Sequence, residues 1–558
     1  MEFSKNQVYP VLIQDLTQEG MGVAKVEGFT VFVPNTAIGD RGEIKLVKVL
    51  KHYGYGILTR LDSPSPDRVE PDCPVSGKCG GCLLRHISYE SELRWKQGMV
   101  ADCFARIGEI DLPVSPILGS EVREGYRNKA QYPIQTGKDG KLKAGFYAGR
   151  SHRLVEQTRC KLQPPVFGEI LEWVLAFGDA HGWTGYDEAT GKGLLRHLYL
   201  RMGFATGEIM VCPVVGGKGH LPQEQEFAHS LAEAFPGVAS IVLNHNPQNT
   251  NVILGRENWL LWGKDTIDDI LCGVRVTLSP HSFYQVNRDQ AQRLYETALG
   301  LAQLKDSDVL LDLYCGAGTI GLAAAGLVKQ VYGAEIVPQA VENAKRNAAQ
   351  NQIHNAEFLC ADCSQAVEKF ARRGIRPDVI VVDPPRKGCA SEVLEAIRQF
   401  GPDRLVMISC NPATAARDCK ALAEMGFEAE QIVPVDLFPR TGHVETVVLL
   451  SHKKPDGHIN VKVEFGEGEG KVPLDNIAKR AEEYKPKERV IYKMIKEYIE
   501  AKYGFKVHTA YIAEVKRDLG LPMYDAPNAV EELKQPRKHP TPEKVEAIKD
   551  ALKHFEVI

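Results

Sequence analysis

The sequence predicts a multidomain protein: an N-terminal OB-like β-barrel, a central α+β domain, a Rossmann-like α/β domain and a small helical C-terminal extension. With 558 residues, the chain is several times longer than a single domain of roughly 100–200 residues. Its first sixty-odd residues alternate apolar and polar positions between regularly spaced glycines, which is typical of short strands. From Asp306 onward, strand-like and helix-like segments alternate as in a doubly wound parallel sheet. The predicted boundaries are 1–65 for the barrel, 66–290 for the central domain, 291–452 for the α/β domain and 453–558 for the extension.

Composition indicates an ordinary soluble globular protein. The chain has 68 Lys and Arg against 72 Asp and Glu, and its 44% hydrophobic and 25% charged residues exclude a disordered or collagen-like chain. No stretch approaches the roughly 20 apolar residues of a membrane span, and the N-terminus lacks the pattern of a secretory signal. We therefore expect a cytoplasmic monomer without a membrane partner. Thirteen cysteines in such a protein point to metal ligation or thiolate chemistry rather than to disulfides.

The barrel carries a basic stretch. Between Arg41 and Arg60 there are five basic residues and one acid, Glu43, with Tyr53 and Tyr55 interleaved. Basic side chains beside aromatic rings suit single-stranded RNA, because charge follows the phosphates while rings stack on bases. A solvated strand face is the alternative interpretation.

The two other flanking regions give weaker signals. The central region mixes helical segments, such as ESELRWKQGMVADCFARIG, with strand-like segments, such as YRNKAQYPIQ. In the extension, two Lys-rich helical segments flank Gly504. They are compatible with a helix-turn-helix-like appendage, or with a helical hairpin that packs on the main body.

A cysteine cluster lies just after the barrel. Cys73, Cys79 and Cys82 have a C-x5-C-x2-C spacing in DCPVSGKCGGC, and Cys160 in EQTRCKLQPP is the best candidate for a fourth ligand. An iron–sulfur cluster, a four-thiolate zinc site and unrelated buried thiols are the three possible interpretations. Zinc sites usually pair two short C-x2-C hooks, and only one is present here.

A glycine loop predicts an adenosine-containing cofactor. In VLLDLYCGAGTIGLA, a buried strand ends near Tyr314, and Gly316 and Gly318 allow a ligand to approach the backbone closely. Glu335 ends the next strand, where its carboxylate can accept the ribose hydroxyls, and Asp362 follows the third. The D-L-x-C-G-x-G pattern suits S-adenosylmethionine (SAM) better than a dinucleotide, which usually has G-x-G-x-x-G.

VIVVDPPRKG ends the fourth strand of the α/β domain. Asp383 and two prolines form a rigid loop at the edge where ligands of such sheets bind. Similar DPPY loops occur in amino-group methyltransferases that act on DNA, where an aromatic residue stacks on the base. Arg386 stands at that position here, so we expect no DNA substrate.

A cysteine and an acid supply the remaining chemistry. Cys410 in MISCNPAT ends the fifth strand at the same edge. C5 of uracil is a poor nucleophile, but a thiolate that adds to C6 converts the ring into an enolate able to attack a sulfonium methyl group. Glu445 in GHVETVVLL can then remove the C5 proton, with His443 as an alternative base. Taken singly, Cys410 is better interpreted as a buried core cysteine, but its position at the catalytic edge beside a SAM site favours a nucleophile.

Together these motifs resemble a known family. C-x5-CGGC, LDLYCGAGTIG, DPPRKG, SCNPAT and TGHVET, in this order, resemble the RNA uracil-5-methyltransferases over roughly residues 5–452. The barrel resembles the TRAM domain of those members that modify 23S ribosomal RNA. The Lys-rich extension lies beyond the usual end of the family, and the resemblance implies no role for it.

The resemblance implies a role for each motif. It implies that a [4Fe–4S] cluster is bound by Cys73, Cys79, Cys82 and Cys160. It implies that SAM is held by Gln285 in SFYQVN, Tyr314, Glu335 and Asp383, with Asp362 near the adenine. Phe283 and Gln285 would border the pocket for the target base, and Asp383 would also orient it. Cys410 would be the nucleophile and Glu445 the general base. RNA contacts would come from Arg127, Lys129, Arg196 and His197, for which ordinary salt bridging is the alternative.

The predicted function is SAM-dependent methylation of a uridine in 23S ribosomal RNA to 5-methyluridine. The cluster would organise the RNA-binding region, because no step of this reaction is a redox step. Two alternatives remain: a 5-methyluridine methyltransferase that acts on transfer RNA, and a non-catalytic iron–sulfur RNA-binding protein.

Overall fold

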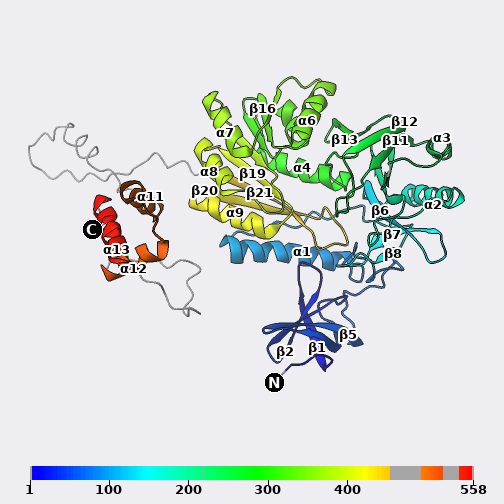
Figure 1. Ribbon diagram of the computed structural model, residues 1–558, viewed down its shortest axis with the longest axis horizontal. Helices are drawn as coiled ribbons and strands as arrows, with labels where there is room; N and C mark the ends of the chain where they lie inside the picture. The colour runs from blue at the N-terminus through cyan, green and yellow to red at the C-terminus, as the bar shows by residue number, and fades with distance from the viewer. Residues whose placement is uncertain (1–2, 218, 453–491, 520–539, 556–558) are drawn as a thin grey trace, which may run out of the picture. The chain divides into compact units, whose positions relative to one another are not determined.

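The computed structural model describes residues 3–217, 219–452, 492–519 and 540–555 (Figure 1). The chain divides into two compact units, residues 1–458 and 459–558, which are described separately. None of the described helices is long and apolar enough to cross a membrane.

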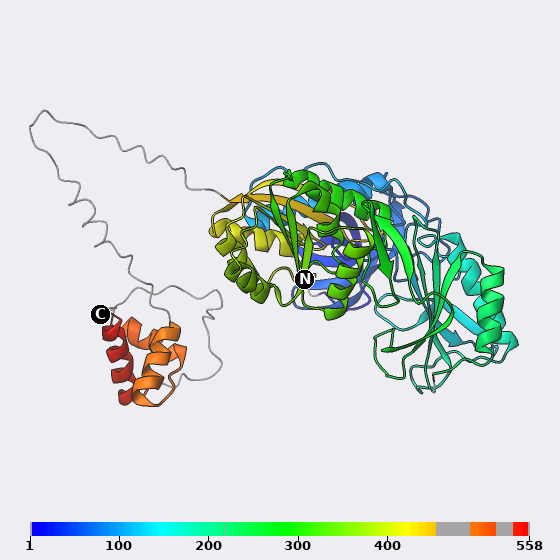
Figure 2. The ribbon, with the colours of Figure 1, turned by 90° about the horizontal axis from the view of Figure 1, so that it is seen from above.

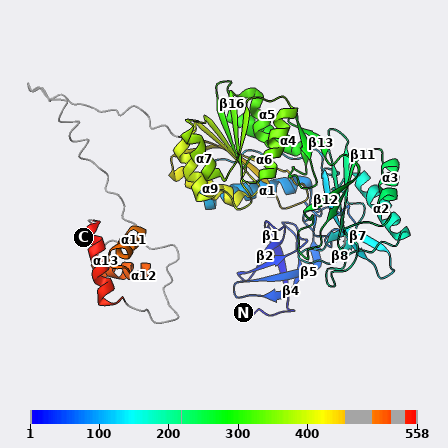
Figure 3. The ribbon, with the colours of Figure 1, turned by 45° about the horizontal axis from the view of Figure 1, so that its top comes forward.

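The first unit begins with the predicted barrel. Five strands close on themselves in the order β1-β2-β3-β5-β4 (Figure 3). Their bounds are β1 Val8–Leu16, β2 Gly22–Val26, β3 Phe29–Val33, β4 Arg41–Val49 and β5 Tyr53–Ser63. Inward-facing residues such as Ile13, Val31 and Ile44 are fully buried and alternate with exposed ones. Gly42 allows β4 and β5 to approach closely, because a Cβ there would lie 2.1 Å from the carbonyl oxygen of Arg60.

A long helix and a seven-stranded sheet follow. Helix α1 (Tyr89–Cys103) continues into the π-helix η1 (Phe104–Gly108). The sheet has the order β12-β11-β10-β9-β6-β7-β8, and α2 (Pro165–Ala180) lies beside α3 (Glu224–Ala234) against it (Figure 2). The strands are β6 Lys129–Thr136, β7 Leu142–Tyr147, β8 Leu154–Glu156, β9 Leu195–Met202, β10 Ile209–Val215, β11 Val238–His245 and β12 Glu257–Gly263.

The hairpin of β13 (Ile267–Leu271) and β14 (Val274–Leu278) leads into the predicted α/β domain. Its sheet has the order β17-β16-β15-β18-β19-β21-β20. The strands are β15 Val309–Leu313, β16 Gln330–Glu335, β17 Ala356–Cys360, β18 Val379–Val382, β19 Arg404–Ser409, β20 Phe427–Val435 and β21 Glu445–His452.

Helices cover both faces of this sheet. One face is covered by α4 Arg288–Ala302, α5 Thr319–Ala324 with the 3-10 turn η2 Ala325–Leu327, and α6 Pro338–Gln350. The other is covered by α7 Cys363–Arg372, α8 Ser391–Phe400 and α9 Pro412–Glu424 (Figure 3). Because helices lie on both sides, every residue of β18 is buried, as expected for a central parallel strand.

Strand β21 breaks the parallel pattern. It runs antiparallel to both β19 and β20, and Ser409 pairs with Thr446. The start of β21 therefore lies beside the end of β19. This orientation brings Glu445 to the sheet edge where Cys410 follows β19.

The second unit contains α11 (Tyr492–Tyr503), α12 (Thr509–Asp518) and α13 (Pro542–His554). Their own apolar core includes Ile499, Ile512 and Ile548. Gly504, with a φ of 72°, ends α11, so the two helices predicted around it are present. The rest of the predicted extension, residues 453–491 among it, lies outside the described residues.

Candidate active site

Four of the predicted site residues gather at one edge of the α/β sheet. Tyr314 follows β15, Asp383 follows β18, Cys410 follows β19 and Glu445 begins β21. The carboxyl ends of β15, β18 and β19 are adjacent in the sheet, and β21 adds its amino end to them. The register places Cys410 and Glu445 on neighbouring strands, one residue beyond the Ser409–Thr446 pair.

Three carboxyl groups at this edge have a raised affinity for protons. Burial raises the pKa of Asp383 to about 7. Burial and the charge of Asp383 raise the pKa of Glu445 to about 8. Asp312, inside β15, is fully buried, and burial with the nearby acids also raises its pKa to about 8. Its Oδ2 accepts the backbone N–H of Gly321 at 3.0 Å, while Oδ1 has no partner among the described residues.

Arg386 stands beside the predicted nucleophile. Burial and the neighbouring Glu445 raise the pKa of the Cys410 thiol, and the Arg386 guanidinium opposes this shift. Arg386 also lies 3.1 Å from the ring nitrogens of His443. Burial and Arg386 lower the pKa of His443 to about 4. At neutral pH, His443 is therefore a much weaker base than the carboxylate of Glu445.

The glycine loop and the next strand form the predicted cofactor edge. Gly318 precedes α5 with a φ of 79°, and a Cβ there would lie 2.8 Å from the Phe358 ring. The Glu335 carboxylate accepts the backbone N–H groups of Gly316 at 3.1 Å and Val337 at 2.9 Å. Asp362 caps α7 through the Ser364 N–H.

The SFYQVN segment lies between β14 and α4. Asn128 donates from Nδ2 to the carbonyl oxygen of Gln285 at 2.9 Å, and Phe283 is 74% exposed. Tyr295 on α4 is buried close to Gln285, Asp383 and Glu445, and its pKa is raised well above 10. Sequence reasoning did not identify Tyr295, because a tyrosine on the buried face of an amphipathic helix looks like any core residue.

The segment before Glu445 is tied to α1 and to the cysteine loop. Lys96 is fully buried and donates to Glu92 at 2.8 Å and to Asp436 at 2.6 Å. The carbonyl oxygen of Arg440 accepts the backbone N–H groups of Leu83 and Leu84, at 2.9 and 3.2 Å. These two residues directly follow Cys82, so the cysteine loop and the loop before Glu445 support each other.

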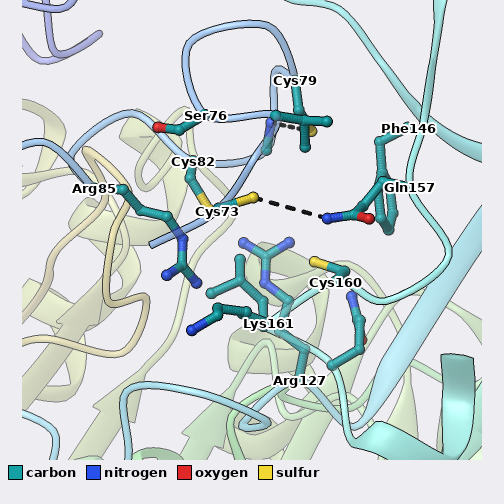
Figure 4. A pocket seen from close by; sticks show the side chains of 14 residues that line it. Cys73, Ser76, Cys79, Cys82, Arg85, Arg127, Phe146, Gln157, Cys160 and Lys161 are labelled. Carbon is teal, nitrogen blue, oxygen red and sulfur yellow. Dashed lines mark hydrogen bonds between the residues drawn. The ribbon is translucent and has the colours of Figure 1, made fainter. Parts of the chain in front are cut away.

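All four predicted cysteine ligands line one cavity of about 50 Å³. In Figure 4, the sulfur atoms of Cys73, Cys82 and Cys160 face a common space, and the guanidinium of Arg127 points towards it. The Gly81 N–H donates to the sulfur of Cys79 at 3.4 Å. The fold thus brings Cys160 close to Cys73, Cys79 and Cys82, which lie far from it in the sequence.

The surroundings of this cavity carry unsatisfied positive groups. Arg85 donates to Asp72 at 2.6 Å. Its Nε and second terminal nitrogen, and Nε of Arg127, are buried without a hydrogen-bond partner in the described part of the chain. Within the described ranges, no three His, Cys, Asp or Glu side chains are placed to hold one metal ion.

Two of the residues expected to contact RNA are internal. Arg196 is 4% exposed and donates to the carbonyl oxygens of Asn246 and Gln248, at 2.6 and 2.7 Å. His197 is 9% exposed, and burial lowers its pKa to about 4. The burial of both side chains contradicts the expected RNA contacts of this pair, and Arg196 instead binds backbone carbonyls. Arg127 lines the cysteine cavity, and burial lowers the pKa of Lys129 to about 8.

Comparison with known proteins links this geometry to a family. Residues 263–453 match the family described as tRNA (uracil-5-)-methyltransferase, and residues 2–59 match the TRAM domain. Among solved structures, the tRNA (uracil-54, C5)-methyltransferase of Pyrococcus abyssi, in complex with S-adenosyl-L-homocysteine, is similar, with a TM-score of 0.63 and 27% identity. The match covers 79% of this chain and all of that one.

Relatives of greater identity cover most of the chain. An uncharacterized RNA methyltransferase of Halalkalibacterium halodurans is 45% identical over 81% of this chain and 98% of its own length. One from Clostridium tetani is 42% identical over 80% of this chain and 97% of its own. The chain belongs to the RNA uracil-5-methyltransferase family and carries a TRAM domain at its N-terminal end.

Proposed function

We propose that the protein transfers a methyl group from SAM to C5 of a specific uridine in 23S ribosomal RNA. The observation that carries this proposal is the pairing of β19 with β21, which puts Cys410 and Glu445 side by side next to Asp383. A thiol beside a carboxyl group whose pKa lies near neutrality suits addition to a ring followed by proton removal.

The proposed steps use this chain's own groups. The Cys410 thiol gives its proton to water. The thiolate then bonds to C6 of the uracil while the C5–C6 double bond opens to an enolate, which makes C5 nucleophilic. After C5 has taken the methyl group, Glu445 removes the C5 proton, the C6–S bond breaks and the thiolate leaves. Asp383 orients the ring, and the exposed Phe283 and neighbouring Gln285 border the base. The target uridine leaves its stack to reach this edge.

The carboxyl groups of the site fit SAM, which supplies a methyl group on a positively charged sulfur. Asp312 has a buried oxygen without a partner, and the pKa values of Asp312, Asp383 and Glu445 are all raised. A nearby cation stabilises the ionised form of a buried acid whose pKa is raised. The residues proposed to hold SAM are Gln285, Tyr314, Glu335 and Asp383, with Asp362 near the adenine.

We propose that Cys73, Cys79, Cys82 and Cys160, which line one cavity, bind a [4Fe–4S] cluster. Each thiolate of such a cluster binds its own iron, so the sulfur atoms surround a volume instead of one ion. The buried, unpartnered donors of Arg85 and Arg127 suit a group of net negative charge. The cluster would supply a cross-link between the cysteine loop and Cys160, and no catalytic step depends on it.

We propose that the RNA substrate lies against the barrel and the central domain, which precede the α/β domain. The proposed domain boundaries fall after residues 65, 290 and 452. Arg127 and Lys129 remain proposed contacts, and a ribosomal RNA substrate places the enzyme in the cytoplasm. A second candidate substrate is transfer RNA, since the solved relative from Pyrococcus abyssi is a tRNA methyltransferase. The third candidate, a non-catalytic RNA-binding protein, has no use for the paired Cys410 and Glu445.

The test is to map 5-methyluridine by mass spectrometry in 23S ribosomal RNA and transfer RNA from cells with and without the gene. We expect one or more uridines of 23S ribosomal RNA to lose the methyl group. Loss only in transfer RNA selects the second candidate, and no loss in either selects the third. The Cys410→Ala variant must fail to restore the modification, whereas the Glu445→Gln variant must accumulate a covalent protein–RNA adduct that survives denaturation.

A further inference from the structure

A second cavity of about 440 Å³ opens beside the proposed active site. Its walls come from three elements: the barrel, the end of α1 with η1, and the start of α9. Asn411 and Pro412 form part of the wall and directly follow Cys410. Its volume lies within the range of about 300–1,000 Å³ that ligand pockets usually have.

The barrel wall also contacts the loop that carries the proposed base. A Cβ at Gly442 would lie 2.1 Å from the carbonyl oxygen of Gln18, which lines the cavity. Gly442 is three residues before Glu445. The wall of this cavity is therefore continuous with the segments that carry Cys410 and Glu445.

Trp95 and Met99 on α1 give the cavity an apolar wall. Trp95 is 8% exposed, and its indole N–H donates to the carbonyl oxygen of Leu16 at 3.2 Å, which fixes the ring plane. Met99 lies one turn further along α1. At the rim, Ile38 and Ile107 are 36% and 42% exposed, which leaves apolar surface uncovered at the mouth.

The charges of the cavity favour a base over a phosphate. Among the described residues that line it, the acids are Asp15 and Asp102 and the one positive side chain is Arg106. Arg106 lies 3.4 Å from Asp102, and its side chain is 77% exposed. Carboxylate and amide oxygens accept hydrogen bonds from base edges but repel phosphate, while an arginine at the rim can stack on a base.

We propose that this cavity binds the base of one unpaired nucleotide that neighbours the target uridine in the same RNA strand. The base lies against Trp95 and Met99, its edge faces the acids, and its phosphates stay in solvent. This proposal rests on the proposed function, because it needs an RNA whose uridine reaches Cys410.

Gly98 offers a clean way to fill the cavity. It lines the cavity from the middle of α1, its side is exposed, and a Cβ there meets no atom within 4 Å. A Cβ therefore fits at this position, and Gly98→Phe should place a ring in the cavity without loss of helix propensity. The matched control is Gly300→Phe, since Gly300 lies near the end of α4, is exposed and also has no atom within 4 Å of a Cβ.

The experiment uses the full chain and an RNA fragment that carries the uridine mapped above, intact or with one neighbouring base removed. For the unsubstituted enzyme, one such abasic RNA should raise KM at least about fivefold, the lower end of what one stacked base contributes. Gly98→Phe should raise KM for the intact RNA by a similar factor. For this variant, KM should be the same for the intact and the abasic RNA. Its kcat and its affinity for SAM should stay unchanged.

Each result decides the proposal. If Gly98→Phe keeps the original KM, or if all abasic fragments behave like the intact one, no base binds in the cavity. If Gly300→Phe raises KM as much as Gly98→Phe does, the effect does not come from the cavity. If the unsubstituted enzyme transfers no methyl group to uridine, the proposed function fails before this inference is reached.

Discussion

The three acidic side chains at the sheet edge determine how the site responds to pH. With pKa values of about 8 for Asp312 and Glu445 and about 7 for Asp383, they are largely protonated at pH 6 and ionised at pH 9. The ionised forms attract the positive sulfonium of SAM. S-adenosylhomocysteine has a neutral sulfur, so the ionised carboxylates do not strengthen its binding.

We therefore expect the ratio of SAM affinity to S-adenosylhomocysteine affinity to rise about tenfold between pH 6 and pH 9, which corresponds to a one-unit fall of one carboxyl pKa on binding. Isothermal titration calorimetry at several pH values measures it. The Asp312→Asn variant should flatten the dependence. Equal pH dependence for the two ligands would show that the sulfonium does not lie near these acids.

Arg386 offers a second prediction at this scale. Its positive charge opposes the rise in the pKa of Cys410, so its removal leaves less thiolate at a given pH. In the Arg386→Gln variant, alkylation of Cys410 by iodoacetamide at pH 8 should slow about threefold to tenfold, a shift of up to one pKa unit. Mass mapping of the Cys410 peptide measures the rate. The neighbouring exposed Lys387 supplies the control, since Lys387→Gln should leave the rate unchanged.

At residue scale, the sequence predicts those groups that stand in recognisable motifs. Cys410, Asp383 and Glu445 each follow or begin an apolar strand, and the fold brings them together. Asp312 and Arg386 stood in the same motifs, but nothing in the motif shows an oxygen without a partner or a guanidinium beside a thiol. The prediction fails for Arg196 and His197, because the sequence of a strand does not show whether its polar residues face solvent or the interior.

At the scale of elements, α1 is joined to the loop between β20 and β21 by a buried ion network. Lys96 holds both Glu92 and Asp436 there, and all three side chains are fully buried. Removal of the lysine leaves the buried Asp436 without a cation and leaves Glu92 with Arg440 alone, 3.6 Å away. Loss of one partner of a buried ion pair typically costs about 3–5 kcal/mol.

The Lys96→Met variant should therefore unfold at a clearly lower urea concentration than the original protein, followed by circular dichroism. Its matched control is Lys143→Met. Lys143 pairs with Asp139 and Glu156 at the surface, where ion pairs contribute little, so this variant should unfold near the original midpoint. Similar midpoints for the two variants would mean that the buried network does not stabilise the fold.

The sequence predicts the elements better than their orientation. The period-two pattern of the first sixty residues predicts the barrel, which the structure confirms, and the strand–helix alternation predicts the doubly wound sheet. The apolar run of β21 contains no signal for its antiparallel direction, because direction is decided by pairing with β19. That direction is what brings Glu445 to Cys410.

At the scale of the whole molecule, the second unit has its own apolar core. The relatives match only 80–81% of this chain while almost all of their own length is covered, and every proposed site residue lies in the first unit. A chain that ends at residue 458 should keep methyl transfer to the mapped uridine within about twofold, measured with radiolabelled SAM. A chain that ends at residue 443 lacks Glu445 and β21 and should be inactive. Loss of transfer in the longer truncation would assign the second unit a part in the reaction.

The ion pair between Lys96 and Asp436 also sets an order for folding during synthesis. Its partners are separated by 340 residues, so at about 5–20 residues per second the ribosome needs about 20–70 s to produce Asp436 after Lys96. Throughout this interval Glu92, one turn away on α1, is the only acid of the network available to Lys96. The nascent helix thus carries a local partner for its lysine. The loop before Glu445 can pack on α1 only after nearly the whole first unit has been synthesised. The proposed active site is therefore completed in one late step of folding.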